Sequence, residues 1–490
     1  MGNSSILRTK RVETVLEQDE GGGQHLTKRL KARDLVGFGV GIVIGTGIFT
    51  LTGIQAKENA GPGIVVSFLI AGVVALLAAL CYAELAAAVP TAGSSYTYAY
   101  TTIGEVFAWI IAWDLVLEFA LGAAVVSRGW SGYLQELLGL PETFFGENSV
   151  VNLGAVAIVV VLAVVAALGI RESKWLTNLL VAVKVLICIF VVIAGFFFVK
   201  VANLTPFFPP ATPKESAGAW HQQPLWQALS GVQPVAYGVG GLLVAAAVVF
   251  FAYSGFEAVA NLGEESQNPG RDMPRGLIGT LVACGLLYML VSLVLTGMVK
   301  YTDISEGAPI SDAFKQVGLG WAAVLVGIAA IAGLSSVILV EIVALGRIGY
   351  ALSRDRLLPP SLGKLNERYN TPVRMTILIA ILISALAAFI PLTALSEMVS
   401  IGTLFAFLVV SIAVLVLRRT RPDMERPFKT PLVPVVPILS AVTCLGLMAS
   451  LEVGTWLRFV VWLAVGMIIY FAYGRRHAVV GHESAGSSRS

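Results

Sequence analysis

A glycine-rich stretch inside an apolar segment carries the clearest chemical signal in this chain. The stretch reads Gly39-Val40-Gly41-Ile42-Val43-Ile44-Gly45-Thr46-Gly47-Ile48-Phe49, with four glycines and a threonine within nine positions. Each glycine costs a helix interior about 1 kcal/mol relative to alanine. In hydrocarbon, a broken helix leaves backbone N–H and C=O groups unpaired, which is tolerated only where they face protein or a water-filled cavity. The stretch therefore predicts a membrane helix that breaks in order to hold a ligand with its backbone.

A second apolar segment is interrupted in a similar way. It reads Val249-Phe250-Phe251-Ala252-Tyr253-Ser254-Gly255-Phe256-Glu257-Ala258, with a Ser-Gly pair followed by an acidic residue. Interrupted segments at matching places in two halves of a chain are typical of inverted-repeat transporters and of their binding sites. Taken alone, the glycines of the first segment could simply permit close helix packing. The second break favours the binding interpretation.

The two breaks offer complementary groups to a zwitterion. The free amides of Gly45, Thr46 and Gly47 open a half-helix, whose N-terminal end carries about half an elementary positive charge and favours a carboxylate. The carbonyl groups of the preceding turn, residues 42 to 44, favour an ammonium group. Residues 252 to 255 repeat this arrangement in the second segment. The predicted substrate is therefore an α-amino acid, and the backbone cradle leaves its side chain open.

Lys184 lies deep in a third apolar segment, nine residues beyond Trp175. At 1.5 Å per residue, that is roughly 13 Å inside the membrane. A midplane charge costs at least ~2.5 kcal/mol, and a lysine that snorkels lies nearer a helix end. We interpret the ammonium group as replacing a sodium ion against carbonyls of the broken helix; snorkelling, or a structural bond to a carbonyl, is the alternative. Ser335 and Ser336 could supply hydroxyls opposite Lys184 or bond to their own helix.

Two acidic residues, Asp114 and Glu118, lie four positions apart in another apolar segment and so share one helix face. Glu118 is about fourteen residues from the inner end of its segment, near the middle of the membrane. Desolvation favours the protonated form of a carboxyl group, which can then take up a proton near neutral pH. Glu118 is thus predicted to be a proton-coupling or substrate-linked group. A structural hydrogen bond to a neighbouring helix is its alternative, and is the interpretation that we favour for Asp114.

Other side chains near these segments are open to two interpretations. Glu257 could pair with a free amide of the break or brace its helix. Phe251 and Phe256 flank the break, and either could cover a small substrate or pack against lipid or protein. Glu341 and Arg347 lie six residues apart in one segment, do not face each other, and are interpreted as structural.

The composition sets the class of protein that must position these residues. The chain has 490 residues, of which 57% are hydrophobic and 13% are charged, and its mean hydropathy is +0.82. Soluble domains carry about 25% charged residues. Many apolar runs of about 20 residues predict an all-α polytopic membrane protein. The four cysteines all fall in apolar runs, which indicates buried thiols, and no metal or cofactor is expected. The first 34 residues are polar, which argues against a cleavable signal peptide.

The hydropathy pattern predicts twelve membrane spans. Segments on the side of the N-terminus would hold about 24 Lys and Arg, against about 7 on the other side, so both termini are expected in the cytoplasm. The expected spans are 35–55, 64–89, 104–126, 150–169, 175–199, 236–262, 276–299, 318–352, 374–390, 394–418, 434–451 and 457–474.

The spans predict a division of the chain into repeats, tails and a long extracellular connection. The expected parts are a cytoplasmic tail (1–34), a first inverted repeat (35–199), an extracellular loop that forms a structured cap (200–235), a second inverted repeat (236–418), two appended spans with their cytoplasmic link (419–474) and a C-terminal tail (475–490).

These motifs resemble, over about residues 28–475, the amino acid–polyamine–organocation superfamily and within it the bacterial branch of the cationic amino-acid transporter family. The motifs that carry the resemblance are Gly45–Phe49, Pro90–Tyr96, Trp113–Glu118, Lys184, Phe251–Glu257 with Glu264–Pro269, and the proline-rich link Arg421–Pro437. In combination they are highly specific.

The resemblance implies a 5+5 inverted-repeat fold with two extra C-terminal helices, and alternating access to an L-amino acid at the midplane. It implies that Lys184 stands in place of sodium, hence proton coupling or exchange rather than sodium symport, and it places Glu118 beneath the site with Phe256 as a candidate gate. Position 257 is commonly Asp in the family and is Glu here, and Ser254 replaces an often apolar residue. The substrate-binding residues expected are Val43, Gly45, Thr46, Gly47, Phe251, Ala252, Ser254 and Phe256.

The leading functional hypothesis is import of L-amino acids across the plasma membrane by a proton-coupled, sodium-independent transporter. An amino-acid exchanger, a uniporter and a non-transporting sensor on the same fold are the alternatives. All four histidines lie in tails or the long loop, and the sequence has no metal-ligand pair, nucleophile elbow or phosphate loop, which argues against an enzyme. The expected partners are the amino acid, protons and the bilayer. A small accessory transmembrane subunit is a further possible partner, and no nucleic acid is expected.

Overall fold

The computed structural model describes most of the chain. The described residues are 30–88, 104–147, 149–169, 174–214, 219–369, 371–423 and 425–477. The motif at 90–96 and most of both predicted tails lie outside them.

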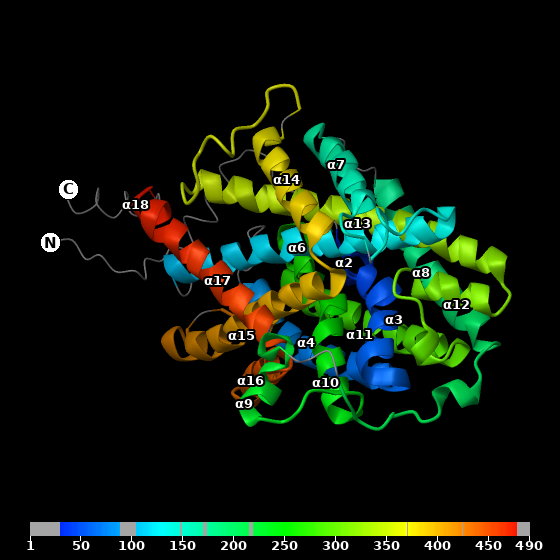
Figure 1. Cartoon of the computed structure of the whole chain (residues 1–490). Coiled ribbons are helices and arrows are strands. Elements are labelled where there is room, and N and C mark those ends of the chain that lie inside the picture. The colour runs from blue at the N-terminus through cyan, green and yellow to red at the C-terminus, as the bar shows by residue number, and fades with distance from the viewer. Residues whose placement is uncertain are drawn as a thin grey trace, which may run out of the picture.

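The described chain is mostly helical, as predicted (Figure 1). Its α-helices are α2 (Ala32–Val43), α3 (Thr52–Gln55), α4 (Ile64–Ala88), α6 (Glu105–Leu138), α7 (Leu153–Ala167), α8 (Lys174–Phe196), α9 (Leu225–Ser230), α10 (Gly238–Val249), α11 (Pro269–Met298), α12 (Pro309–Gln316), α13 (Gly320–Arg354), α14 (Val373–Phe389), α15 (Leu392–Thr420), α16 (Val435–Ala449), α17 (Val453–Ile469) and α18 (Arg475–His477). Two short strands, β1 (Thr212–Pro213) and β2 (Val235–Ala236), pair antiparallel.

The lengths and apolar compositions of the helices identify the protein as a polytopic helical membrane protein. Eight helical segments of the described chain are long and apolar enough to cross a bilayer. Three shorter apolar helices, α7, α14 and α16, accompany them. Helix is present within each of the twelve predicted ranges. That each of them crosses the membrane stays a prediction.

The first interrupted helix breaks where the glycines predict. The helix α2 ends at Val43, and Ile44 has extended backbone angles (φ −74°, ψ 101°). The chain resumes as a π-helical turn, η1 (Gly47–Leu51), which continues through α3 and a second π-helical turn, η2 (Ala56–Ala60). π-Helical turns are rare and are frequent at functional sites.

The second interrupted helix also breaks at its Ser-Gly pair. The helix α10 passes into a 3₁₀ segment, η6 (Phe250–Tyr253), and Ser254 is extended. Gly255 has a φ of +91°, a conformation that only glycine adopts without strain. Beyond it, residues Phe256–Glu265 form a 3₁₀ helix, η7, where a regular half-helix was expected. Such long 3₁₀ stretches are uncommon because their hydrogen bonds have poorer geometry.

The helices α6 and α13 form the long central pair of the molecule. They lie side by side through its middle, with α7 and α14 next to each other at the upper edge of the view (Figure 1). The indole Nε1 of Trp130 on α6 donates to the hydroxyl of Ser335 on α13 at 3.0 Å. The helix α11 packs against both α4 and α2, and α15 packs against α6, α4 and α16. Of these helices, α11 packs against α2 of the first broken helix. Single residues of α6 and α13 approach the break, Gly129 beside Thr46 and Val337 beside Gly45.

The long connection before α10, which the sequence predicts to be a structured extracellular cap, contains several short regular elements. Its described residues include β1, β2 and α9, with two short 3₁₀ turns at Val201–Leu204 and Trp220–Gln222. The cap is tied to the turn between α16 and α17, because the amide of Leu225 donates to the carbonyl of Leu451 at 2.9 Å. Its Lys214 donates to the side chain of Asn59, at the C-terminal end of the first broken helix, at 3.2 Å.

A buried carboxylate joins α4 to the C-terminal end of α15. Glu84 is 3% exposed and accepts two hydrogen bonds of 2.8 Å from the guanidinium of Arg418. It also accepts a bond of 2.8 Å from the amide of Thr430, and Arg426 lies 3.3 Å away. A bidentate Arg–carboxylate pair has fixed geometry, so this cluster anchors the link between α15 and α16.

We predict that Glu84→Gln lowers the apparent melting temperature in detergent by several degrees. The amide keeps the shape but removes the charge that two guanidinium groups face, and breaking a buried ion pair costs ~3 kcal/mol or more. As a control, Glu306→Gln removes a partner of Lys57 in a pair whose side chains are 36% and 35% exposed, which contributes only about 0–1 kcal/mol. Equal melting temperatures for both variants would contradict the anchoring role.

Candidate functional site

The two breaks meet. A Cβ atom built on Gly47 would lie 2.3 Å from the Cβ and 2.5 Å from the Cα of Ala252. Only glycine allows such an approach, so Gly47 is fixed by contact with the second interrupted helix. The predicted residues of the first break and Ala252 of the second therefore line one place in the fold.

The first break leaves backbone donors unused. Within the described part of the chain, no hydrogen bond has the amide of Gly45, Thr46 or Gly47 as its donor. The buried hydroxyls of Thr46 and Thr50 also have no partner there. Almost all buried polar groups in proteins are hydrogen-bonded. These donors thus form an arrangement that suits an anionic group.

Three carbonyl groups near the first break accept hydrogen bonds from surrounding helices. The Nζ atom of Lys184 on α8 donates to the carbonyl of Gly41 at 2.8 Å. The hydroxyl of Tyr288 on α11 donates to Val43 at 2.7 Å, and that of Tyr133 on α6 donates to Phe49 at 2.7 Å. The carbonyl of Val43, predicted to contact substrate, is therefore engaged by a tyrosine in this structure.

Lys184 lies where the sequence places it, next to the first break. The side chain is 1% exposed. Its stem runs along Gly333 of α13, where a built Cβ would lie 2.9 Å from Cγ of the lysine. Ser335 and Ser336 bond to carbonyls of their own helix at 2.8 Å each, so the second of their two predicted alternatives is confirmed.

The buried acids Asp114 and Glu118 of α6 have different surroundings, and Glu118 is the one shown in contact with the second break. Glu118 is 4% exposed, and its carboxyl contacts that of Glu257, which is 3% exposed. Glu257 in turn accepts from the amide of Gly255 at 3.1 and 3.2 Å, so its predicted pairing with a free amide is confirmed. Asp114 is fully buried and faces Gly402 of α15; neither of its carboxyl oxygens has a partner among the described residues.

The aromatic residues of the second break are packed in the protein interior. Phe256 is 0% exposed, with ring centroids 5.2 Å from Phe407 and 6.4 Å from Tyr82. Phe251 is 6% exposed, and its carbonyl accepts from both the amide and the hydroxyl of Ser254. Of the predicted residues in this segment, Ala252 contacts Gly47 of the first break.

Sequence reasoning missed the two tyrosines that bond to the broken helix. Tyr133 and Tyr288 are both 0% exposed. The sequence contains a signal for them, because a tyrosine in a buried apolar segment needs a hydrogen-bond partner for its hydroxyl. The unpaired carbonyls predicted in the first break are natural partners.

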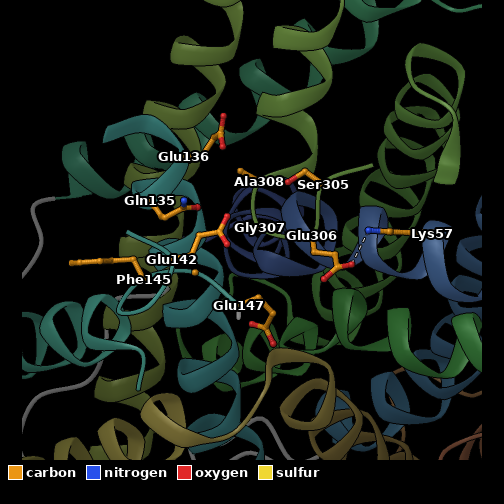
Figure 2. A pocket seen from close by; sticks show the side chains of 11 residues that line it. Lys57, Gln135, Glu136, Glu142, Phe145, Glu147, Ser305, Glu306, Gly307 and Ala308 are labelled. Atoms are coloured by element: carbon orange, nitrogen blue, oxygen red, sulfur yellow. Dashed lines mark hydrogen bonds and ion pairs between the residues drawn. The ribbon is translucent and has the colours of Figure 1, made fainter. Parts of the chain in front are cut away.

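A separate cavity of about 240 Å³ lies near the ends of α6 and α12 (Figure 2). Its lining includes Lys57, Glu136, Glu142, Glu147 and Glu306, and none of the predicted site residues. Figure 2 shows Glu306 reaching toward Lys57, with their charged atoms 2.8 Å apart. The other acids differ in their partners: Glu136 pairs with Lys315 and Glu147 with Arg128.

Two interrupted membrane helices that meet at unpaired backbone groups define the protein as a membrane transporter. The chain belongs to the amino acid permease family, whose model matches residues 30–473.

Named relatives agree with a transporter rather than an enzyme. The chain is 40% identical over 487 residues to the methylthioribose transporter of Bacillus subtilis, covering 97% of this chain and 99% of the relative. It is 39% identical over 487 residues to the branched-chain amino acid permease BcaP of the same organism, covering 97% and 98%. It is 38% identical over 429 residues to the vacuolar cationic amino acid transporter 4 of Arabidopsis thaliana, covering 86% and 68%.

We predict that Gly47→Ala abolishes transport. The new methyl group would stand 2.3 Å from the Cβ of Ala252, so the two breaks would be forced apart. Uptake of a labelled amino acid into proteoliposomes measures the effect. Gly446→Ala on α16 is the matched control, since a Cβ there meets nothing within 4 Å. Normal uptake by Gly47→Ala would show that close contact between the breaks is dispensable.

Proposed function

We propose that the protein imports L-amino acids across the plasma membrane by alternating access, coupled to protons and independent of sodium. The observation that carries the proposal is the bond from Lys184 to the carbonyl of Gly41, beside the unused amides of the first break. A fixed ammonium group occupies carbonyls that could otherwise coordinate a cation. A sodium ion would compete with this charge.

The substrate class follows from the groups at the break. The amides of Gly45, Thr46 and Gly47 suit a carboxylate. The carbonyls of Ile42 and Ile44 accept no hydrogen bond within the described residues, and suit an ammonium group. An α-amino acid carries both, whereas methylthioribose, named for one relative, carries neither. The relatives named for branched-chain and cationic amino acids favour the same assignment.

The proton-coupling group in this proposal is Glu118. Its carboxyl contacts that of Glu257, and two carboxyl groups can bond to each other only if one of them holds a proton. Glu257 is anchored to the second break through Gly255. Loss of the shared proton would place two like charges in contact and drive η7 away from α6. Protonation would thus be linked to the position of the second broken helix.

The proposed architecture has twelve spans with both termini in the cytoplasm. Residues 35–199 and 236–418 would form the two inverted repeats, each opening with a broken helix, and residues 419–474 the appended pair. The eight long and three short apolar helices are consistent with this arrangement. The cap would then lie outside the cell, over the outer end of the first broken helix.

Uptake into proteoliposomes tests the function. With labelled alanine and arginine, we expect an inward proton gradient to raise the initial rate and to drive accumulation, with no effect of sodium. Uptake that is independent of the proton gradient but is stimulated by internal amino acid would indicate an exchanger. Uptake that depends neither on the proton gradient nor on internal amino acid would indicate a uniporter. Binding of amino acid without any uptake would indicate a sensor.

We predict that Lys184→Ala abolishes proton-driven accumulation, because the carbonyl of Gly41 loses the ammonium group that donates to it. Lys315→Ala is the control, since that side chain is exposed and pairs with Glu136 at the surface. Full transport by the Lys184 variant would contradict the role of the lysine.

We also predict that Glu118→Gln removes the pH dependence of uptake while leaving substrate binding intact. The amide cannot release a proton, yet it can keep a hydrogen bond to Glu257. Initial rates between pH 5 and pH 8 measure the effect. A pH profile equal to that of the unmodified protein would assign the coupling elsewhere.

A further inference from the structure

Asp114 is a buried acid about one helical turn from Glu118, the proposed proton-coupling group. The two residues lie four positions apart on α6, so they share one face and are about 6 Å apart along the helix axis. The side chain of Asp114 is 0% exposed. In the proposed topology α6 begins on the cytoplasmic side, so Asp114 lies one turn nearer the cytoplasm than Glu118.

The structural hydrogen bond that the sequence predicts for Asp114 is not formed. Within the described part of the chain, neither carboxyl oxygen has a hydrogen-bond partner and no basic side chain pairs with the group. The facing helix, α15, presents Gly402, where a built Cβ atom would lie 3.0 Å from Oδ1 of Asp114. Buried polar groups with a structural role are almost always hydrogen-bonded. A charged carboxylate without a partner is costly to bury, so this group rests with its proton on.

A buried hydroxyl lies beside the two acids. Thr403 follows Gly402 on α15, is 0% exposed, and interacts with the carboxyl of Glu118. A hydroxyl can carry a proton between two carboxyl groups, because it both donates and accepts. On its other side Glu118 contacts Glu257, which is bonded to the second break. The groups that can hold or pass a proton therefore form a row that runs from the second break to Asp114.

We propose that Asp114 is the relay through which the proton of Glu118 leaves toward the cytoplasm; this inference rests on the proposed proton-coupled transport. Water that enters from the cytoplasmic side accepts the proton of Asp114, whose O–H bond breaks. The carboxylate that is left takes the proton of Glu118 and becomes neutral again. The net result is one proton moved from Glu118 to cytoplasmic water, which leaves Glu118 charged beside Glu257. Acidic side chains in series form proton relays in membrane pumps and transporters.

The test separates proton release from movement of the substrate in proteoliposomes. Accumulation of labelled alanine or arginine under an inward proton gradient requires that a proton be released inside, where trapped pyranine reports the acidification. Counterflow, the exchange of labelled external for unlabelled internal amino acid, needs no net proton movement. Asp114→Asn keeps the shape of the side chain but has no acidic proton. We expect it to slow accumulation and acidification about tenfold or more, with counterflow within about twofold of that of the unmodified protein.

Two further variants complete the test. Glu105→Gln is the matched control, because Glu105 is another buried acid of α6, nine residues earlier and so on the opposite face of the helix. Its Oε1 accepts from the hydroxyl of Tyr470 at 2.7 Å. This variant is expected to leave the ratio of accumulation to counterflow unchanged. Asp114→Ser also removes the acid, with a smaller side chain, and keeps the test decisive if Asp114→Asn fails to fold.

The outcomes separate this inference from the proposed function. If the unmodified protein accumulates amino acid and the Asp114 variants do so equally well, the relay is overturned while proton coupling stands. A parallel loss of accumulation and counterflow in both Asp114 variants would also overturn it, because a merely structural role predicts that result. An unmodified protein that exchanges amino acids without any proton-driven accumulation would overturn the proposed proton coupling itself.

Discussion

The structure depends on one constraint: backbone groups freed by a broken helix at membrane depth must find partners inside the protein. Two helices break here, and they meet through the contact of Gly47 with Ala252. Carbonyl groups of Gly41, Val43 and Phe49 accept from Lys184, Tyr288 and Tyr133, which come from three different helices. Within the described part of the chain, the carbonyls of Ile42 and Ile44 and the amides of Gly45, Thr46 and Gly47 make no hydrogen bond, and these groups define the candidate site.

The same constraint organises the surrounding helices. The pair α6 and α13 carries small residues where groups of the site must approach closely: Gly122 opposite Glu341, Gly129 opposite Thr46, and Gly333 beside Lys184. Because glycine has no side chain, these positions leave space for the polar groups opposite them. Along this helix pair, Glu341, Thr46 and Lys184 thus each lie against a glycine.

Much of this arrangement could be predicted from the sequence because its signals are local. Glycines and a Ser-Gly pair at membrane depth predict both breaks, and the depth of Lys184 predicts its contact with the broken helix. Other features depend on the register between distant segments. That Tyr288 takes the carbonyl of Val43, or that Glu341 faces Gly122, follows from how α11 and α6 are placed, which no pattern within one segment reveals.

The central claim is that unused amides of the first break hold the carboxylate of an amino acid. Calorimetric titration of the purified protein with L-arginine and L-leucine, each compared with its own α-carboxamide, tests it most directly. The account predicts that whichever amino acid binds loses at least tenfold in affinity as the carboxamide, because the helix end then faces a neutral group. Equal affinities for the acid and its amide would contradict the account.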